Sequence, residues 1–311
     1  MADVRKDLTL YYEGVDITDD VDFITCICHD MSSGECDCLD LKVDHAEKWF
    51  KWGPQKNDRI RVTRSGYDTK TMYLNTIVPE NGAYRIYATA CKSNPFTPRW
   101  RAYEDCTLEK ICAICAGECE MDHRLFGVEG SIKYEYLLRE NLSAPAFLEQ
   151  IANREGAVLK TLNGRFTMIG IDYAQDLTAM HTVELDNDQW ASEYIDRRDR
   201  NWSSVEIKTP YGHGIARDRR VSGQTMVLTN IAVDNDAMAY RWARGMLQIH
   251  NRQSERLKIE MDFNPGYTAM VRVDVESRTD ANGKWIIDEV QQNLFEGRTS
   301  AKLSRCITGI R

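Results

Sequence analysis

The sequence has no long apolar run and no excess of basic residues, and each absence excludes a class of protein. No stretch approaches the roughly 20 apolar residues of a membrane helix, and the first residues lack the apolar segment of a secretory signal. The formal net charge is −8, whereas proteins that bind nucleic acid are usually basic. We therefore expect folding in the cytoplasm, no membrane contact and no sequence-specific nucleic-acid binding.

Catalytic motifs are also missing. The sequence has no GxSxG, no HExxH, no glycine-rich phosphate loop and no dinucleotide-binding fingerprint. Two glycines flank His213 within residues 211–218, and without a partner motif this segment is expected to be a flexible loop rather than a catalytic site. Two basic stretches, 196–202 and 217–221, are typical of solvated loops or faces. We expect that the chain is not an enzyme.

Cysteine, by contrast, is abundant, and four of the ten cysteines lie in the stretch ITCICHDMSSGECDC: Cys26, Cys28, Cys36 and Cys38. Residues two apart on a strand share a face. A hairpin that pairs Cys28 with Cys38 would therefore gather all four thiols on one face, and a register shifted by one would place them on opposite faces. The first register could hold zinc or an iron–sulfur cluster, although such sites usually use C-x-x-C turns. Half-buried, reduced thiols are favoured, with a metal as the alternative.

A second group of cysteines lies on a predicted helix that Thr107 can cap. Cys112, Cys115 and Cys119 follow each other at i, i+3 and i+7, and Cys106 precedes the helix. This spacing suits a metal-binding stripe and a core stripe equally well. Because isoleucines accompany the cysteines, a buried core stripe is favoured, and no cofactor is expected.

The hydrophobic pattern predicts a mainly β fold with α+β insertions. Alternating segments and hairpin turns predict an antiparallel barrel or sandwich over residues 1–91. Residues 92–175 read as an α+β middle module: a connector over 93–103, two helices capped by Thr107 and Ser143, and a hairpin at Asn163-Gly164. Residues 176–311 predict a second antiparallel β module that contains one long helix, 234–253.

The order of these elements resembles a known family. Residues 32–62 contain an S-G-E turn, a D-x-x-x-K-W segment and a P-x-K-x-D turn, and the matching residues are Asp44, Lys48, Trp49, Pro54, Lys56 and Asp58. Asn57 stands where glycine is usual, and asparagine tolerates the left-handed conformation. Residues 96–121, 143–171, 234–261 and 283–306 are similar to further blocks of the same family. The chain thus resembles the baseplate hub proteins of contractile phage tails, of the late control D type.

The resemblance implies a homotrimer in which each subunit contributes two tube-like antiparallel β-barrel domains and a helix-containing middle module. Such a hub adapts a threefold central spike to a sixfold tail tube and forms part of the central channel. The implied partners are the central spike protein, the tail tube or tube-initiator ring, the tape-measure protein and baseplate wedge proteins. The implied place is the baseplate of a virion, a tailocin or another contractile particle, assembled in the bacterial cytoplasm. The alternatives are a cysteine-ligated zinc or iron–sulfur protein and a carbohydrate hydrolase with β modules.

Overall fold

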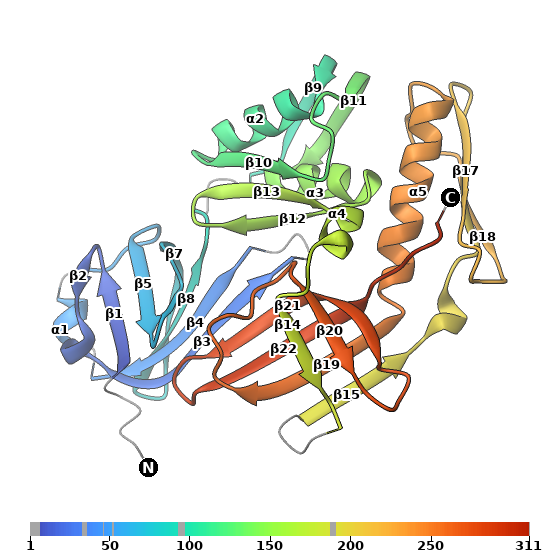
Figure 1. The fold of residues 1–311 in the computed structure, drawn as a ribbon. Coiled ribbons are helices and arrows are strands. Elements are labelled where there is room, and N and C mark those ends of the chain that lie inside the picture. Colours follow the sequence, from blue (N-terminus) through green and yellow to red (C-terminus); the bar gives the residue numbers. More distant parts are fainter. Residues whose placement is uncertain are drawn as a thin grey trace.

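Strands from both ends of the chain join in one large sheet (Figure 1). The computed structural model describes residues 7–32, 36–45, 47–51, 53–92, 97–186 and 191–310. The N-terminal strands are β1 Leu8–Tyr12, β2 Val15–Asp16, β3 Asp22–Met31, β4 Cys38–Asp44, β5 Arg59–Arg64, β6 Tyr67–Asp68, β7 Met72–Glu80 and β8 Ala83–Thr89. The C-terminal strands are β14 His181–Glu184, β15 Ala191–Asp196, β19 Glu255–Asp262, β20 Arg272–Glu276, β21 Gly283–Asn293 and β22 Arg298–Arg305.

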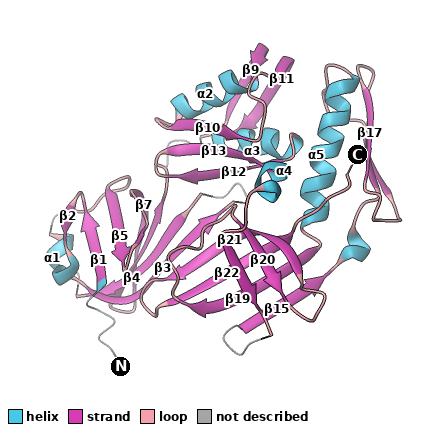
Figure 2. Cartoon of the chain, viewed as in Figure 1, coloured by secondary structure: helices cyan, strands magenta, loops and turns pink. Residues whose placement is uncertain are grey.

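The sheet follows the path β15-β19-β22-β21-β3-β4-β8-β7-β5-β1-β2, and its two halves meet where β3 pairs with β21. β20 joins β21, β14 joins β20 in parallel, and β6 joins β5. The Glu289 carboxylate lies at this seam beside His29 and Lys302, which hold its pKa at about 2. The mainly β architecture with helical insertions that the hydrophobic pattern predicts is confirmed (Figure 2).

Alternating apolar side chains build the N-terminal core as the pattern predicts. On β1, Leu8, Leu10 and Tyr12 are buried and the residues between them are half-buried. The short helix α1, Glu47–Phe50, adds the fully buried Trp49, whose ring lies 5.5 Å from that of Tyr12. Asn57 has a φ of 73°, so it adopts the left-handed conformation expected of it. The turn predicted at Ser33-Gly34 lies outside the described residues.

The middle part of the chain alternates strands with short helices. Its elements are β9 Arg99–Thr107, α2 Leu108–Glu118, β10 Asp122–Phe126, β11 Lys133–Leu142, α3 Ala144–Arg154, β12 Ala157–Leu162, β13 Arg165–Gly170 and α4 Ile171–Asp176. The Thr107 and Ser143 caps are confirmed, and Asn163 and Gly164 both have positive φ in the predicted hairpin turn. Residues 99–103, expected within a connector, instead belong to strand β9, because β9 finds its hydrogen-bond partner in the distant β11.

The long helix expected at 234–253 is α5, Asp236–Arg252, and it packs against a small sheet and against α3. The sheet consists of β16 Ser204–Lys208, β17 His213–Arg217 and β18 Thr225–Leu228. Elsewhere in the described residues, Thr18–Asp20 and Arg198–Arg200 form single-turn 3-10 helices. Buried side chains of α5 share one core with those of α2 and α3.

The boundaries between the three predicted modules, at 91/92 and 175/176, stay predictions. Within the described residues, no helix combines the length and the apolar character needed to cross a membrane.

Candidate functional site

The cysteines of the first hairpin do not converge. The observed register is the shifted one, with Cys28 opposite Leu39 and His29 opposite Cys38. Cys26 and Cys28 therefore share the buried face with Leu39, whereas Cys38 lies half-buried on the other face. The register of a hairpin is set by the burial of its apolar side chains. The observed register buries the leucines and the valine of β4.

The structure instead brings Cys36 next to Cys91. Their sulfur atoms lie 3.4 Å apart, although the residues are 55 positions apart in the chain. The contact with Cys91 and burial both raise the pKa of the Cys36 thiol, and the same contact lowers the pKa of Cys91. Sequence spacing does not single out this pair, because only the sheet brings the end of β8 alongside the start of β4.

The helix cysteines are buried in the core. Cys106, Cys112, Cys115 and Cys119 all lie in the cluster that α2 forms with its neighbours. Burial raises the pKa of Cys112 and Cys119 to about 12, whereas a metal binds the thiolate form. The part of the chain that the structure describes contains no group of three or more His, Cys, Asp or Glu side chains suited to a metal. That the chain carries no cofactor stays a prediction.

The segment around His213, expected to be a flexible loop, is the strand β17. The imidazole Nε2 lies 2.8 Å from the Glu206 carboxylate across the β16–β17 pair. Gly214 is required by close packing rather than by flexibility, because a Cβ there would lie 2.2 Å from the backbone nitrogen of Tyr240 on α5. The histidine therefore belongs to a sheet that supports α5.

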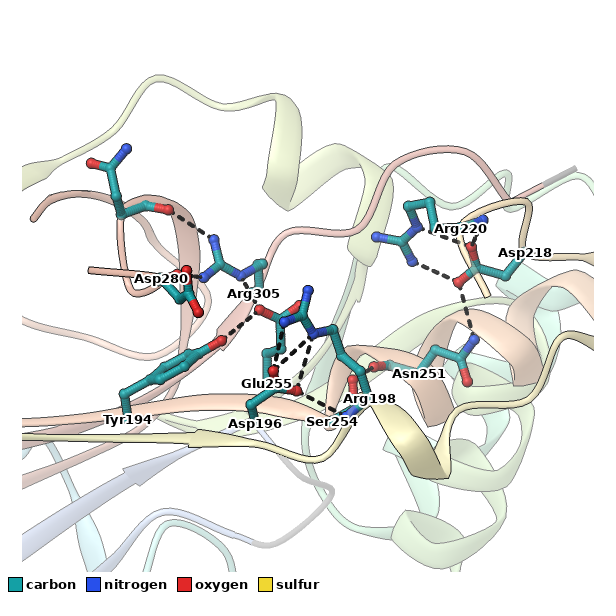
Figure 3. Close-up of polar contacts among 11 residues, drawn as sticks. Tyr194, Asp196, Arg198, Asp218, Arg220, Asn251, Ser254, Glu255, Asp280 and Arg305 are labelled. Atoms are coloured by element: carbon teal, nitrogen blue, oxygen red, sulfur yellow. Dashed lines mark hydrogen bonds and ion pairs between the residues drawn. The ribbon is translucent and has the colours of Figure 1, made fainter. Parts of the chain in front are cut away.

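The two basic stretches of the sequence lie close together, and one arginine of each, Arg198 and Arg220, is paired with carboxylates (Figure 3). Arg198 lies 4.0 Å from Glu255, to which Arg305 also donates at 2.6 Å. Arg220 donates to Asp218 at 2.6 Å. These two pairs reduce the positive charge that the stretches could offer to phosphate groups.

A buried charged cluster joins three distant parts of the chain. Lys160 on β12 is only 8% exposed, and its ammonium contacts Asp30 on β3 and lies 3.6 Å from Asp37. Thr268 and the backbone N–H of Ala269 also donate to Asp30. We call Asp30, Asp37, Lys160 and Thr268 the junction cluster. Sequence reasoning missed it, although a lysine inside the apolar stretch AVLKTL was a usable signal.

The junction cluster makes stability depend on pH, because it holds two carboxylates but one ammonium. Burial raises the pKa of Asp37 to about 7, against the opposing attraction of Lys160. The folded chain thus retains a proton that the unfolded chain loses near pH 4. The free energy of unfolding that this retained proton contributes is complete below pH 4. It falls as the pH rises from 4 through 7, by up to about 1.4 kcal/mol per pH unit.

Replacing Asp37 with asparagine is therefore expected to flatten this part of the stability profile between pH 4 and 7. The measurement is a series of urea titrations over that range on the wild-type chain and the variant. Asp19→Asn, at an exposed position, serves as the control and should keep the wild-type slope. An Asp37→Asn profile parallel to that of the wild type would contradict the assignment.

The arrangement of the elements can be compared with known proteins. No family model and no curated protein matches the sequence. The 43 kDa tail protein of prophage MuSo2 from Shewanella oneidensis superposes with a TM-score of 0.70 at 12% identity, over 96% of both chains. A tail protein from Neisseria meningitidis MC58 does so with a TM-score of 0.73 at 12% identity, also over 96% of both chains. The chain has the fold of phage tail proteins.

The tail-protein fold also occurs in a secretion system. An Escherichia coli component of the type VI secretion system, described as structurally similar to the T4 bacteriophage tail proteins gp27 and gp5, matches with a TM-score of 0.59 at 11% identity. That match covers 96% of this chain and 77% of the E. coli chain. The resemblance to tail hub proteins that the sequence motifs indicate is thus confirmed at the level of the fold.

Proposed function

We propose that the chain is the structural baseplate hub of a contractile tail or tail-like injection particle. The observation that carries the proposal is the match over 96% of both chains with two phage tail proteins. The fold extends through both halves of the large sheet, the middle module and α5, so the likeness is not confined to one common β motif. The proposed role is structural, and no catalysis is assigned to it.

The hub is proposed to be a homotrimer that lines part of a central channel. Each subunit contributes an N-terminal and a C-terminal β half, joined side by side through the β3–β21 seam. Three subunits would then present six β halves, which is how a threefold spike can meet a sixfold tube. The net charge of −8 supports a channel that does not retain DNA, since an acidic surface repels phosphate groups.

The proposed partners follow from this position. The central spike lies at one end of the hub and the tube or its initiator ring at the other, with the tape-measure protein in the channel and wedge proteins outside. The assembled particle is the proposed location. A cysteine-ligated metal protein is not proposed, because the eight candidate cysteines fall into buried core positions and separate faces of one hairpin.

The test is assembly. The purified chain should form trimers, measured by size exclusion with light scattering, and should bind its spike protein when the two are expressed together. The complex should retain three copies of each protein in native mass spectrometry. A chain that stays monomeric and binds neither spike nor tube protein would overturn the proposal.

A further inference from the structure

The ribbon formed by β9 and β11 presents an apolar face to solvent. Trp100, Ala102 and Glu104 alternate along β9, and Leu138 and Tyr136 lie opposite Ala102 and Glu104 on β11. The exposed fractions are 65% for Trp100, 43% for Tyr136 and 39% for Leu138. We call these five residues the ribbon face. A contiguous exposed apolar patch of this kind marks an interaction surface.

The ribbon face also carries negative charge. Glu104 lies on it, and Glu140 follows Leu138 on the same strand; both are exposed. Neither carboxylate has an ion-pair partner among the residues that the structure describes. A complementary surface should therefore combine an apolar floor with unpaired positive charge.

A cavity of about 390 Å³ at the C-terminal end of α5 has both properties. Its floor is apolar and consists of Met226 on β18 with Met246 and Ile249 on α5. Methionine side chains are flexible and polarisable, so they adapt well to an inserted aromatic ring. We call this cavity the arginine-rimmed groove for the residues that surround it.

The rim of the groove is formed by Arg197, Arg200 and Arg256, all exposed. Among the residues that the structure describes, no aspartate or glutamate lines the groove. Within the described residues none of the three guanidinium groups pairs with a carboxylate, and Arg256 donates only to Gln253. The neighbouring Arg198 and Arg220 are both paired. Unpaired positive charge is thus concentrated at the groove.

We propose that the ribbon face of one copy docks in the arginine-rimmed groove of a second copy. The inference rests on the proposed trimeric hub and assigns its subunit contact. Trp100 enters the methionine floor, as buried aromatic anchors do at interfaces, while Glu104 and Glu140 meet the rim arginines in charge-assisted hydrogen bonds. The ribbon and the C-terminal end of α5 lie apart in Figure 1. The contact is therefore head-to-tail, and three such contacts can close a ring.

Mixing two variants tests the proposal directly. The ribbon variant carries Trp100→Ser and Leu138→Ser, and the groove variant carries Arg197→Glu and Arg200→Glu. Each variant alone should assemble with a dissociation constant raised by about 30-fold or more. A 1:1 mixture should form a heterodimer, because the intact ribbon face of one variant meets the intact groove of the other. Size exclusion with light scattering measures both results, and circular dichroism checks folding.

Two control variants change exposed side chains elsewhere. Val15→Ser with Tyr211→Ser removes apolar surface, and Lys56→Glu with Lys208→Glu reverses the same amount of charge. Both should assemble like the wild-type chain. If the wild type is trimeric and the ribbon and groove variants assemble equally well, the inference is wrong and the proposed hub stands. A wild-type chain that neither self-associates nor binds spike or tube overturns the hub itself.

A cross-link in the otherwise unchanged chain gives an independent measurement. Trp100→p-benzoylphenylalanine should, on illumination, react with Met226 or Met246 of another copy. Mixing isotope-labelled with unlabelled chains identifies the cross-linked peptides as intermolecular by mass spectrometry. Cross-links that reach only other surfaces would refute the assigned contact.

Discussion

Replacing Lys160 with methionine is expected to lower the free energy of unfolding by about 3–5 kcal/mol, the usual cost of removing one partner of a buried ion pair. Methionine retains most of the length and the apolar stem of lysine, so packing changes little. The substitution removes the charge that Asp30 and Asp37 face inside the protein. A carboxylate without its partner in a buried site is costly. Urea titration of both proteins measures the difference.

Two further variants identify the cause. Lys133→Met removes an exposed lysine that pairs with Asp105 at 2.8 Å, and little change is expected because solvent screens such pairs. Adding Asp30→Asn and Asp37→Asn to Lys160→Met should recover much of the lost stability, since no unpaired charge then remains buried. If Lys160→Met is no more destabilising than Lys133→Met, the junction cluster does not hold the three parts of the chain together.

Replacing Gly245 with alanine should destabilise the chain by about 1–3 kcal/mol, as overpacking of a tight interior does. A Cβ at this position on α5 would lie 2.2 Å from the backbone oxygen of Arg154 and 2.4 Å from the backbone nitrogen of Gly156. Both atoms belong to the turn that ends α3 and cannot move as a side chain can. The added methyl group would therefore push α5 away from α3, and thermal unfolding should occur at lower temperature.

Gly117 supplies a matched control, because it is also a helical glycine. It is exposed on α2, and a Cβ there would meet no atom within 4 Å. Alanine loses less conformational freedom on folding, so Gly117→Ala should stabilise the chain by roughly 0.5–1 kcal/mol. The glycine-to-alanine substitution is thus expected to lower the stability at position 245 and to raise it at position 117. An equal gain at both would show that α5 and α3 are not in close contact.

Local features of the molecule could be predicted well from the sequence. Thr107 and Ser143 cap helices because their hydroxyls accept from backbone N–H groups at the helix start. Asn57 has the left-handed conformation because the turn requires it. The alternation of apolar residues on β1 predicts both its conformation and its buried face. Each of these depends on residues within a few positions of one another.

The positions of the cysteines in the fold could not be predicted from local sequence patterns alone. The pattern in the first hairpin allowed two registers, and the choice depended on Leu39 and its neighbours facing a core formed by β1, β5 and α1. The pair formed by Cys36 and Cys91 depended on the same sheet. The start of strand β9 is predicted as a connector because its partner β11 follows a helix and another strand in the chain. None of these partners is near in sequence.

By itself, the sequence determined the mainly β class, the caps at Thr107 and Ser143, the hairpin turn at Asn163-Gly164 and the resemblance to tail hub proteins, because short-range periodicity and local hydrogen bonding encode them. Only the tertiary structure decided the hairpin register, the junction cluster and the placing of three unpaired arginines around a methionine floor. Burial, desolvation and charge pairing depend on residues that are distant in the chain. Their energies depend on distances that exist only once the backbone is folded.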